Sequence, residues 1–202
     1  MSGVSAEVET IQEVIKAFGA KRSAKLLNIS HLDGPAATVS SVGGRLPYFD
    51  VAHFACHAAR DEENPLESRI VLFDDPLPLF SIIQNRGDST PSLAFLSACE
   101  TGLGSERRSE EVVHLAAGML AAGYRGVVGT MWSIPDLYAP DIGKEFYREL
   151  LLGSSEGEVE ERKEGQRDAA YALHCATETL RRKIGNSEIA LLAWVPYVLY
   201  GV

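Results

Sequence analysis

An apolar run that ends in a cysteine and a glycine-bearing turn constrains the fold of this chain most strongly. The run covers Ser92–Gly102 and reads SLAFLSACETG. A short strand that is apolar nearly throughout is typical of a parallel sheet buried on both faces. In such sheets the catalytic and ligand-binding residues lie outside the carboxyl ends of the strands. Cys99 stands at such an end, which makes it a candidate nucleophile.

Two more apolar runs, 48–56 and 126–132, alternate along the chain with segments of helical periodicity. Helices are predicted over 5–18, before Gly43–Gly44, and over 79–84, 110–122 (with Gly123 as C-cap), 141–152 and 168–184. Shorter β-like runs are predicted over 24–29, 69–73 and 193–200, with a turn over 74–78. Strands alternating with helices predict an α/β fold, with a mostly parallel central sheet and helices on both faces.

The composition narrows the classes of partner and the compartment. The chain has 202 residues, 19 basic and 28 acidic, and a net charge of −9. This acidic balance argues against nucleic acid and against anionic membrane surfaces as partners. No segment has the ~18 apolar residues of a spanning helix, and no secretory leader is expected. An odd set of three cysteines predicts a reducing, cytoplasmic setting without a disulfide framework.

The domain organisation follows from the absence of internal repeats and of a long linker in the sequence. We therefore expect a single domain over residues 1–202. The stretch 153–165 is rich in Glu and Ser and poor in apolar residues, so it is expected to be an exposed and flexible acidic loop.

A cysteine thiol needs a base, and the 48–56 run leads directly into His57. An imidazole activates a thiol by taking its proton or by stabilising the thiolate. Because the carboxyl ends of parallel strands meet at one edge of a sheet, His57 and Cys99 are expected to lie there together. The alternative is that Cys99 is a small buried apolar residue, as free cysteines commonly are.

Other side chains near this edge have simpler interpretations. His53 shares a strand face with His57 but lies deeper in the sheet, which favours a core histidine over a second base. Cys56 points to the opposite face and is expected in the core. Strand alternation separates Cys56 from the histidines, and no pair has zinc-ligand spacing, so no metal site is predicted. No Gly-x-Ser-x-Gly elbow of an α/β-hydrolase is present.

Several motifs taken in order resemble the CHAT domain, a caspase-like, separase-related cysteine peptidase domain often fused to tetratricopeptide repeats. The main ones are HFACHA at 53–58, LSACETG at 96–102 and GTMWSIPD at 129–136. Further agreement comes from 111–116, 120–123 and the closing WVPYVLYG at 194–201. The resemblance covers nearly the whole chain, from about Ser5 to Gly201.

The resemblance implies a caspase-like three-layer α/β sandwich and a peptidase that needs no cofactor. His57 and Cys99 occupy the positions of the family's catalytic dyad. The family's oxyanion hole would come from the backbone N–H groups of Cys99 and of the residue after the histidine. The family pattern has glycine at that second position, whereas this chain has Ala58. Alanine donates the same N–H comfortably unless its φ is positive.

The resemblance also implies a protein substrate, cleaved after a basic residue that an acid near the site binds. Asp136 is the expected acid, with Glu100 as a second one. The alternative for Asp136 is that it caps the helix that follows Pro135. A regulatory partner or repeat domain, in cis or in trans, is expected to control cleavage. The alternative function is a regulatory or scaffolding domain without catalysis, which the departure at Ala58 favours.

Overall fold

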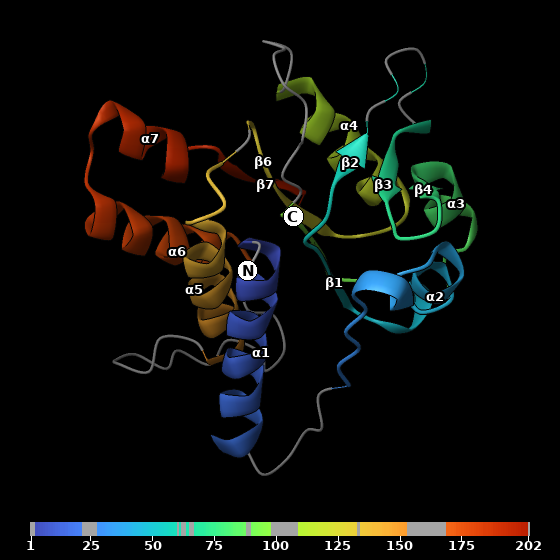
Figure 1. Cartoon of the computed structure of the whole chain (residues 1–202), viewed down its shortest axis with the longest axis horizontal. Helices are drawn as coiled ribbons and strands as arrows, with labels where there is room; N and C mark the ends of the chain where they lie inside the picture. The colour runs from blue at the N-terminus through green and yellow to red at the C-terminus, as the bar shows by residue number, and fades with distance from the viewer. Residues whose placement is uncertain are drawn as a thin grey trace. The chain divides into compact units, whose positions relative to one another are not determined.

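The computed structural model divides the chain into two compact units (Figure 1). One unit comprises residues 1–29 and 134–195, and the other comprises residues 30–133 and 196–202. The residues that the structure describes are 3–21, 28–59, 61, 64, 67–87, 90–97, 109–132, 134–152 and 169–201.

The second unit is built on a four-stranded sheet in the order β1-β5-β6-β7. Its strands are β1 (Val51–Phe54), β5 (Leu93–Leu96), β6 (Gly126–Thr130) and β7 (Tyr197–Gly201). β1, β5 and β6 run parallel, and β7 pairs antiparallel with β6. Every residue of β5 and β6 is buried, as their apolar sequences predict. The α/β fold class with a mostly parallel central sheet is therefore confirmed, and it is consistent with a caspase-like sandwich.

A second, three-stranded sheet in the same unit was not predicted (Figure 1). Its antiparallel strands are β2 (Ala58–Ala59), β3 (Arg69–Val71) and β4 (Pro76–Pro78). The expected run over 69–73 is β3, but the turn expected over 74–78 is wrong for its last three residues.

Burial and edge position explain why a Pro-Leu-Pro segment forms a strand here. Leu77 lies opposite Ile70 across the β3–β4 pair, and the two side chains are only 1% and 2% exposed. Pro76 and Pro78 lack an N–H, but β4 is an edge strand, where a missing donor costs no hydrogen bond on the open side. The apolar side chain therefore outweighs the turn signal of the prolines.

Three α-helices accompany the sheets in the described part of this unit: α2 (Val39–Gly43), α3 (Leu79–Gln84) and α4 (Ser109–Ala121). α4 packs on β6 and on α3, and Gly118 lets it approach Leu79 closely, since a Cβ there would clash with a Leu79 methyl. The core comprises Val42, Ala52, Phe54, Ile70, Leu77, Leu79, Ile82, Ala94, Leu96, Leu115, Ala116, Met119, Ala122, Tyr124 and Val127.

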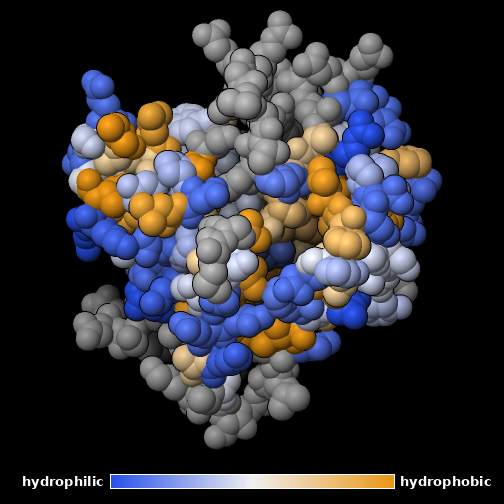
Figure 2. Space-filling model, viewed as in Figure 1, coloured by the Kyte–Doolittle hydropathy of each residue, from blue (hydrophilic) through white to orange (hydrophobic). Residues whose placement is uncertain are grey.

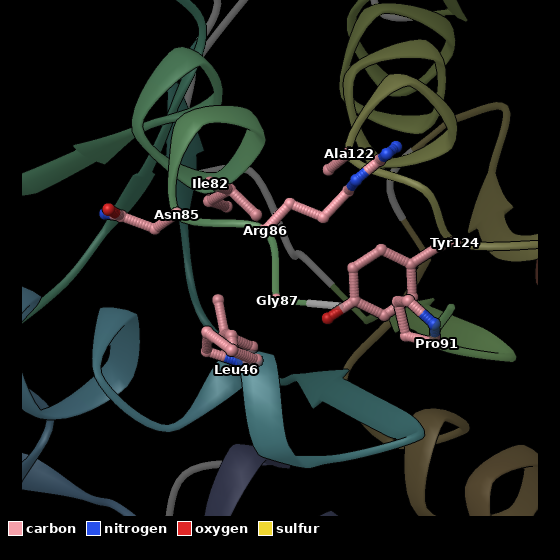
Figure 3. Close-up of a pocket in the computed structure, with 9 residues that line it drawn as sticks. Leu46, Ile82, Asn85, Arg86, Gly87, Pro91, Ala122 and Tyr124 are labelled. Carbon is pink, nitrogen blue, oxygen red and sulfur yellow. The ribbon is translucent and has the colours of Figure 1, made fainter. Parts of the chain in front are cut away.

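α4 ends at the glycine that the sequence predicts as its C-cap. The Gly123 N–H donates to the Leu120 carbonyl at 2.9 Å, and the Tyr124 N–H donates to the Met119 carbonyl at 3.2 Å. These two bonds form a Schellman motif, and Gly123 has the positive φ of +98° that the motif requires. The side chain of Arg86 extends toward this end of α4 (Figure 3), where a cation complements the helix dipole.

Gly123→Ala is expected to destabilise the protein by about 1–2 kcal/mol, because an L residue is strained at this φ. A Cβ at Gly123 would also lie 3.0 Å from the Arg86 Cδ and displace the guanidinium. Urea unfolding measures the change. Gly43→Ala in α2 is the matched control, since its Cβ meets nothing within 4 Å and its φ is not positive. Equal stability of the two variants would contradict the cap.

The described part of the first unit contains four helices: α1 (Gly3–Lys21), α5 (Ala139–Leu152), α6 (Ala169–Ile184) and α7 (Glu188–Trp194). Within the unit α1 packs along α5, α5 along α6, and α6 against α7 (Figure 1). Ile11 and Val14 of the predicted apolar face of α1 are buried. Lys183 of α6 pairs with Asp141 of α5 at 2.7 Å. The helices expected over 5–18, 141–152 and 168–184 are thus confirmed, and each end lies within three residues of its predicted position.

The β-rich run expected over 193–200 is wrong at its start, which forms the end of α7. Ala193 and Trp194 belong to the helix, and β7 starts only at Tyr197. Ser187 caps the helix by accepting the Ala190 N–H at 3.2 Å. α7 also carries exposed apolar side chains, with Ile189 75% and Leu192 55% exposed, visible as orange atoms over this helix in Figure 2.

The remaining local predictions have mixed outcomes. The strand expected over 24–29 lies outside the described residues except for Asn28 and Ile29, which have no regular structure. The strand expected over 48–56 is shorter, because Tyr48 ends a 3-10 turn before β1 begins. The acidic segment 153–165 lies outside the described residues. No described helix has the length and apolar character needed to cross a bilayer.

Candidate active site

His57 follows β1 by three residues and is exposed to solvent. Its backbone carbonyl accepts the Val71 N–H at 2.9 Å, which fixes the main chain at this point to β3. The imidazole thus stands on a rigid backbone with access to solvent. That arrangement suits a residue that exchanges protons with a reacting group.

The register of the sheet relates His57 to the predicted nucleophile. Phe54 is paired with Leu96 at the ends of β1 and β5, and the Ser97 N–H donates to the Phe54 carbonyl at 2.9 Å. The prediction that these two strand ends are neighbours at one edge of the sheet is confirmed. Cys99 follows Leu96 by three positions, as His57 follows Phe54. Cys99 and Glu100 themselves lie outside the described residues, so the dyad stays a prediction.

Ala58 has a backbone conformation that alanine adopts without strain. It lies in β2, and strand residues have a strongly negative φ. Hydrogen-bonded and non-hydrogen-bonded residue pairs alternate between β2 and β3, and this alternation sets the direction of the Ala58 N–H. Since the Val71 N–H bonds to the His57 carbonyl, the next pair, Ala58 with Ile70, is a non-hydrogen-bonded pair. The N–H and C=O of Ala58 therefore point away from β3, toward the open edge of β2.

His53 is half-buried and stacks on Phe95 of the neighbouring strand, with ring centroids 4.8 Å apart and an interplanar angle of 16°. Phe95 is itself buried, so this contact ties β1 to β5 in the interior. The packing agrees with the structural role that the sequence predicts for His53.

Cys56 packs against the hydrophobic core, as expected. Burial raises the pKa of its thiol to about 12, because the apolar surroundings disfavour the thiolate. Cys56 is therefore a poor nucleophile despite its position next to His57. No group of three or more His, Cys, Asp or Glu side chains that could hold a metal ion occurs among the described residues. That the site uses no metal stays a prediction.

Asp136 is exposed in the turn 136–138, which the Tyr138 N–H closes by donating to the Pro135 carbonyl at 3.0 Å. α5 begins only at Ala139, so Asp136 does not occupy its N-cap position. The capping alternative is therefore wrong. Asp136 belongs to the first compact unit, and its role as the substrate-binding acid stays a prediction.

A small cavity in the second unit is lined by other residues and is too small for a peptide side chain. Ile82, Arg86, Gly87 and Tyr124 are among the residues that line it, and the Tyr124 hydroxyl points toward Gly87 (Figure 3). Its volume of about 20 Å³ is room for roughly one water molecule. Burial raises the pKa of Tyr124 to about 12, so its hydroxyl stays protonated at neutral pH.

The residues that hold β2 in place were not predicted from the sequence. β3 supplies the Val71 N–H and the partner of Ala59, while Ser68, just before β3, is fully buried. Ser68 stands among charged and turn-forming residues, a composition that is typical of a surface loop. Only the tertiary pairing of 57–61 with 67–71 reveals its position, so no local sequence signal could have found it.

Comparison with known proteins supports the fold and the motifs together. A family model described as the CHAT domain matches residues 1–202, the whole chain. No curated protein matches the sequence. The matched range includes β1, β5, β6 and β7 of the central sheet and the sequence positions of His57 and Cys99. The chain therefore belongs to the CHAT domain family, whose members are caspase-like, peptidase-related domains.

Proposed function

We propose that the chain acts as a single cysteine endopeptidase domain that cleaves a protein partner. The observation that carries the proposal is the register of β1 and β5. The paired ends Phe54 and Leu96 precede His57 and Cys99 by the same three residues, at the edge where chemistry gathers in parallel sheets. The exposure of His57 and the open N–H of Ala58 support the same function.

In the proposed reaction the Cys99 Sγ attacks the carbonyl carbon of the scissile peptide bond, and His57 takes the thiol proton. The backbone N–H groups of Ala58 and Cys99 stabilise the oxyanion of the tetrahedral intermediate. As the intermediate collapses, the C–N bond breaks and His57 gives the proton to the leaving amine. Water, deprotonated by His57, then attacks the thioester, releasing the carboxylic acid and the Cys99 thiol.

Exposed Asp136 supports a preference for a basic residue before the scissile bond, because a carboxylate pairs well with arginine or lysine. Glu100 is a second acid close in sequence to the nucleophile. We propose that a regulatory partner or repeat domain, in cis or in trans, controls cleavage. The low cysteine count is compatible with action in the reducing cytoplasm.

The non-catalytic alternative depended on Ala58 in place of the family's glycine. Extended backbone at Ala58 weakens that argument, since alanine in a strand offers its N–H as readily as glycine does. A specific observation for a scaffolding role is lacking among the described residues.

The test is covalent labelling by a peptidyl electrophile with arginine or lysine at its reactive end, followed by peptide mass spectrometry. Cys99 is expected to carry the label, and Cys99→Ala is expected to remain unlabelled. Cys56 is the internal control, because a thiol with a pKa of about 12 is thiolate in only about one molecule in ten thousand at pH 8.

The labelling is repeated with every candidate regulator present, since the isolated chain is expected to react slowly. Cys175→Ala is a second control, because Cys175 lies on α6 in the first unit. Equal labelling of Cys99 and Cys175, or none of Cys99 with a regulator present, would sink the peptidase proposal.

A further inference from the structure

β2, which carries Ala58 and begins directly after His57, is unusually dependent on its neighbours. It has only two residues, and among the described strands it pairs only with β3, at the edge of its sheet. A strand this short is not stable by itself, so its backbone conformation depends on a few individual hydrogen bonds to its neighbours. The chain from His57 to Asp61 is attached to 68–71 at alternate residues.

The three attachments follow the antiparallel ladder. The His57 carbonyl accepts the Val71 N–H at 2.9 Å, and Ala59 pairs with Arg69. The next ladder position would join Asp61 to Glu67. Instead, the Asp61 N–H donates to the Ser68 Oγ at 3.2 Å. A serine hydroxyl thus takes the place of a backbone carbonyl in the last bond of the ladder.

Ser68 is well suited to this task because it is buried and hydrogen-bonded to the start of α3. The residue is 0% exposed, and its carbonyl accepts the Leu79 N–H at 2.9 Å, which anchors it to the start of α3. The neighbouring Ile70 is buried in the core opposite Leu77. Ser68 therefore joins the chain that carries His57 and Ala58 to the rigid interior of the unit.

We propose that Ser68 is a positioning residue for the active site. By holding the Asp61 N–H, its hydroxyl fixes β2 and so sets the direction of the Ala58 N–H and the place of the His57 imidazole. The inference rests on the proposed function for its catalytic consequence, but the positioning of His57 can be measured without it. A displacement of about 1 Å at a catalytic group can cost on the order of a hundredfold in rate.

The experiment compares Ser68→Ala with Ser187→Ala. Each variant removes one serine Oγ that accepts one backbone N–H at 3.2 Å, but Ser187 caps α7 in the other unit. Ser68→Ala is expected to speed hydrogen–deuterium exchange at the Asp61 amide and to shift the NMR titration of His57. It is also expected to lower kcat about ten- to a hundredfold, with little change in KM.

Ser187→Ala is expected to leave all three readouts unchanged. Ser68→Cys keeps a side chain of similar size with a weaker acceptor and is expected to be intermediate, which preserves the test if the alanine variant does not fold. Wild-type exchange at Asp61 and a wild-type His57 titration in both Ser68 variants would overturn the proposal. Altered exchange and titration in a chain without peptidase activity would uphold the positioning of His57 and reject the proposed function.

Discussion

His57→Ala is expected to lower kcat/KM by about 10²- to 10⁴-fold, the usual contribution of a general acid–base residue. The same change is expected to slow alkylation of Cys99 by iodoacetamide at pH 7, because the thiol loses the base that holds it as thiolate. The melting temperature is expected to change little, since the His57 side chain is exposed. Peptide cleavage, alkylation rate and thermal unfolding measure the three effects.

His53→Ala is the matched control, because His53 lies four residues earlier on the same chain segment but stacks on Phe95 in the interior. Loss of the stacked ring is expected to cost about 1–2 kcal/mol of stability. Cleavage is expected to fall less than tenfold. The two histidines thus separate catalysis from stability, and a larger rate loss from His53→Ala than from His57→Ala would reverse the assignment.

Ala58→Pro is expected to lower kcat by about 10²- to 10³-fold, the cost of removing one oxyanion donor. Proline has no N–H, and the N–H of Ala58 points to the open edge of β2, so no ladder bond is lost. Alkylation of Cys99 by iodoacetamide forms no oxyanion and is expected to proceed at the wild-type rate. Steady-state cleavage and alkylation therefore diverge in this variant, whereas both fall in His57→Ala.

Two neighbouring changes control for the backbone effect of proline. Ala58→Gly restores the family's residue, keeps the N–H and is expected to cleave within a few-fold of wild type. Ala59→Pro removes an N–H that faces β3, so it is expected to lower the melting temperature. If Ala58→Pro cleaves as fast as Ala58→Gly, the Ala58 N–H is not an oxyanion donor.

Strong periodic signals in the sequence predicted the central sheet and the long helices correctly. β5 is apolar throughout and β6 is apolar except for Thr130, as expected of strands in which every residue is buried, and such runs can be recognised without tertiary information. The expectation that β1 and β5 end side by side came from a general property of parallel strands, whose carboxyl ends lie at the same edge of a sheet. The motifs also predict that His57 and Cys99 share one site, which stays a prediction because Cys99 lies outside the described residues.

The second sheet was beyond the reach of local patterns. β4 has a turn-like sequence and becomes a strand only because Leu77 meets Ile70 in the core. The helical start of 193–200 was missed for a similar reason, since Ala193 and Trp194 are apolar in either conformation. The direction of the Ala58 N–H depends on how β2 pairs with β3, and the sequence does not reveal that pairing.

The pairing of β7 with β6 has a consequence for biosynthesis. β6 is made before α5, α6 and α7, whereas its antiparallel partner follows all three of them. Until β7 has left the ribosome, one side of β6 is an unpaired strand edge, and the sheet beneath the active site is incomplete. Such a long-range pairing closes late and slowly. A nascent chain would therefore lack a complete central sheet until β7 has emerged, and the site proposed at His57 would be unfinished until then.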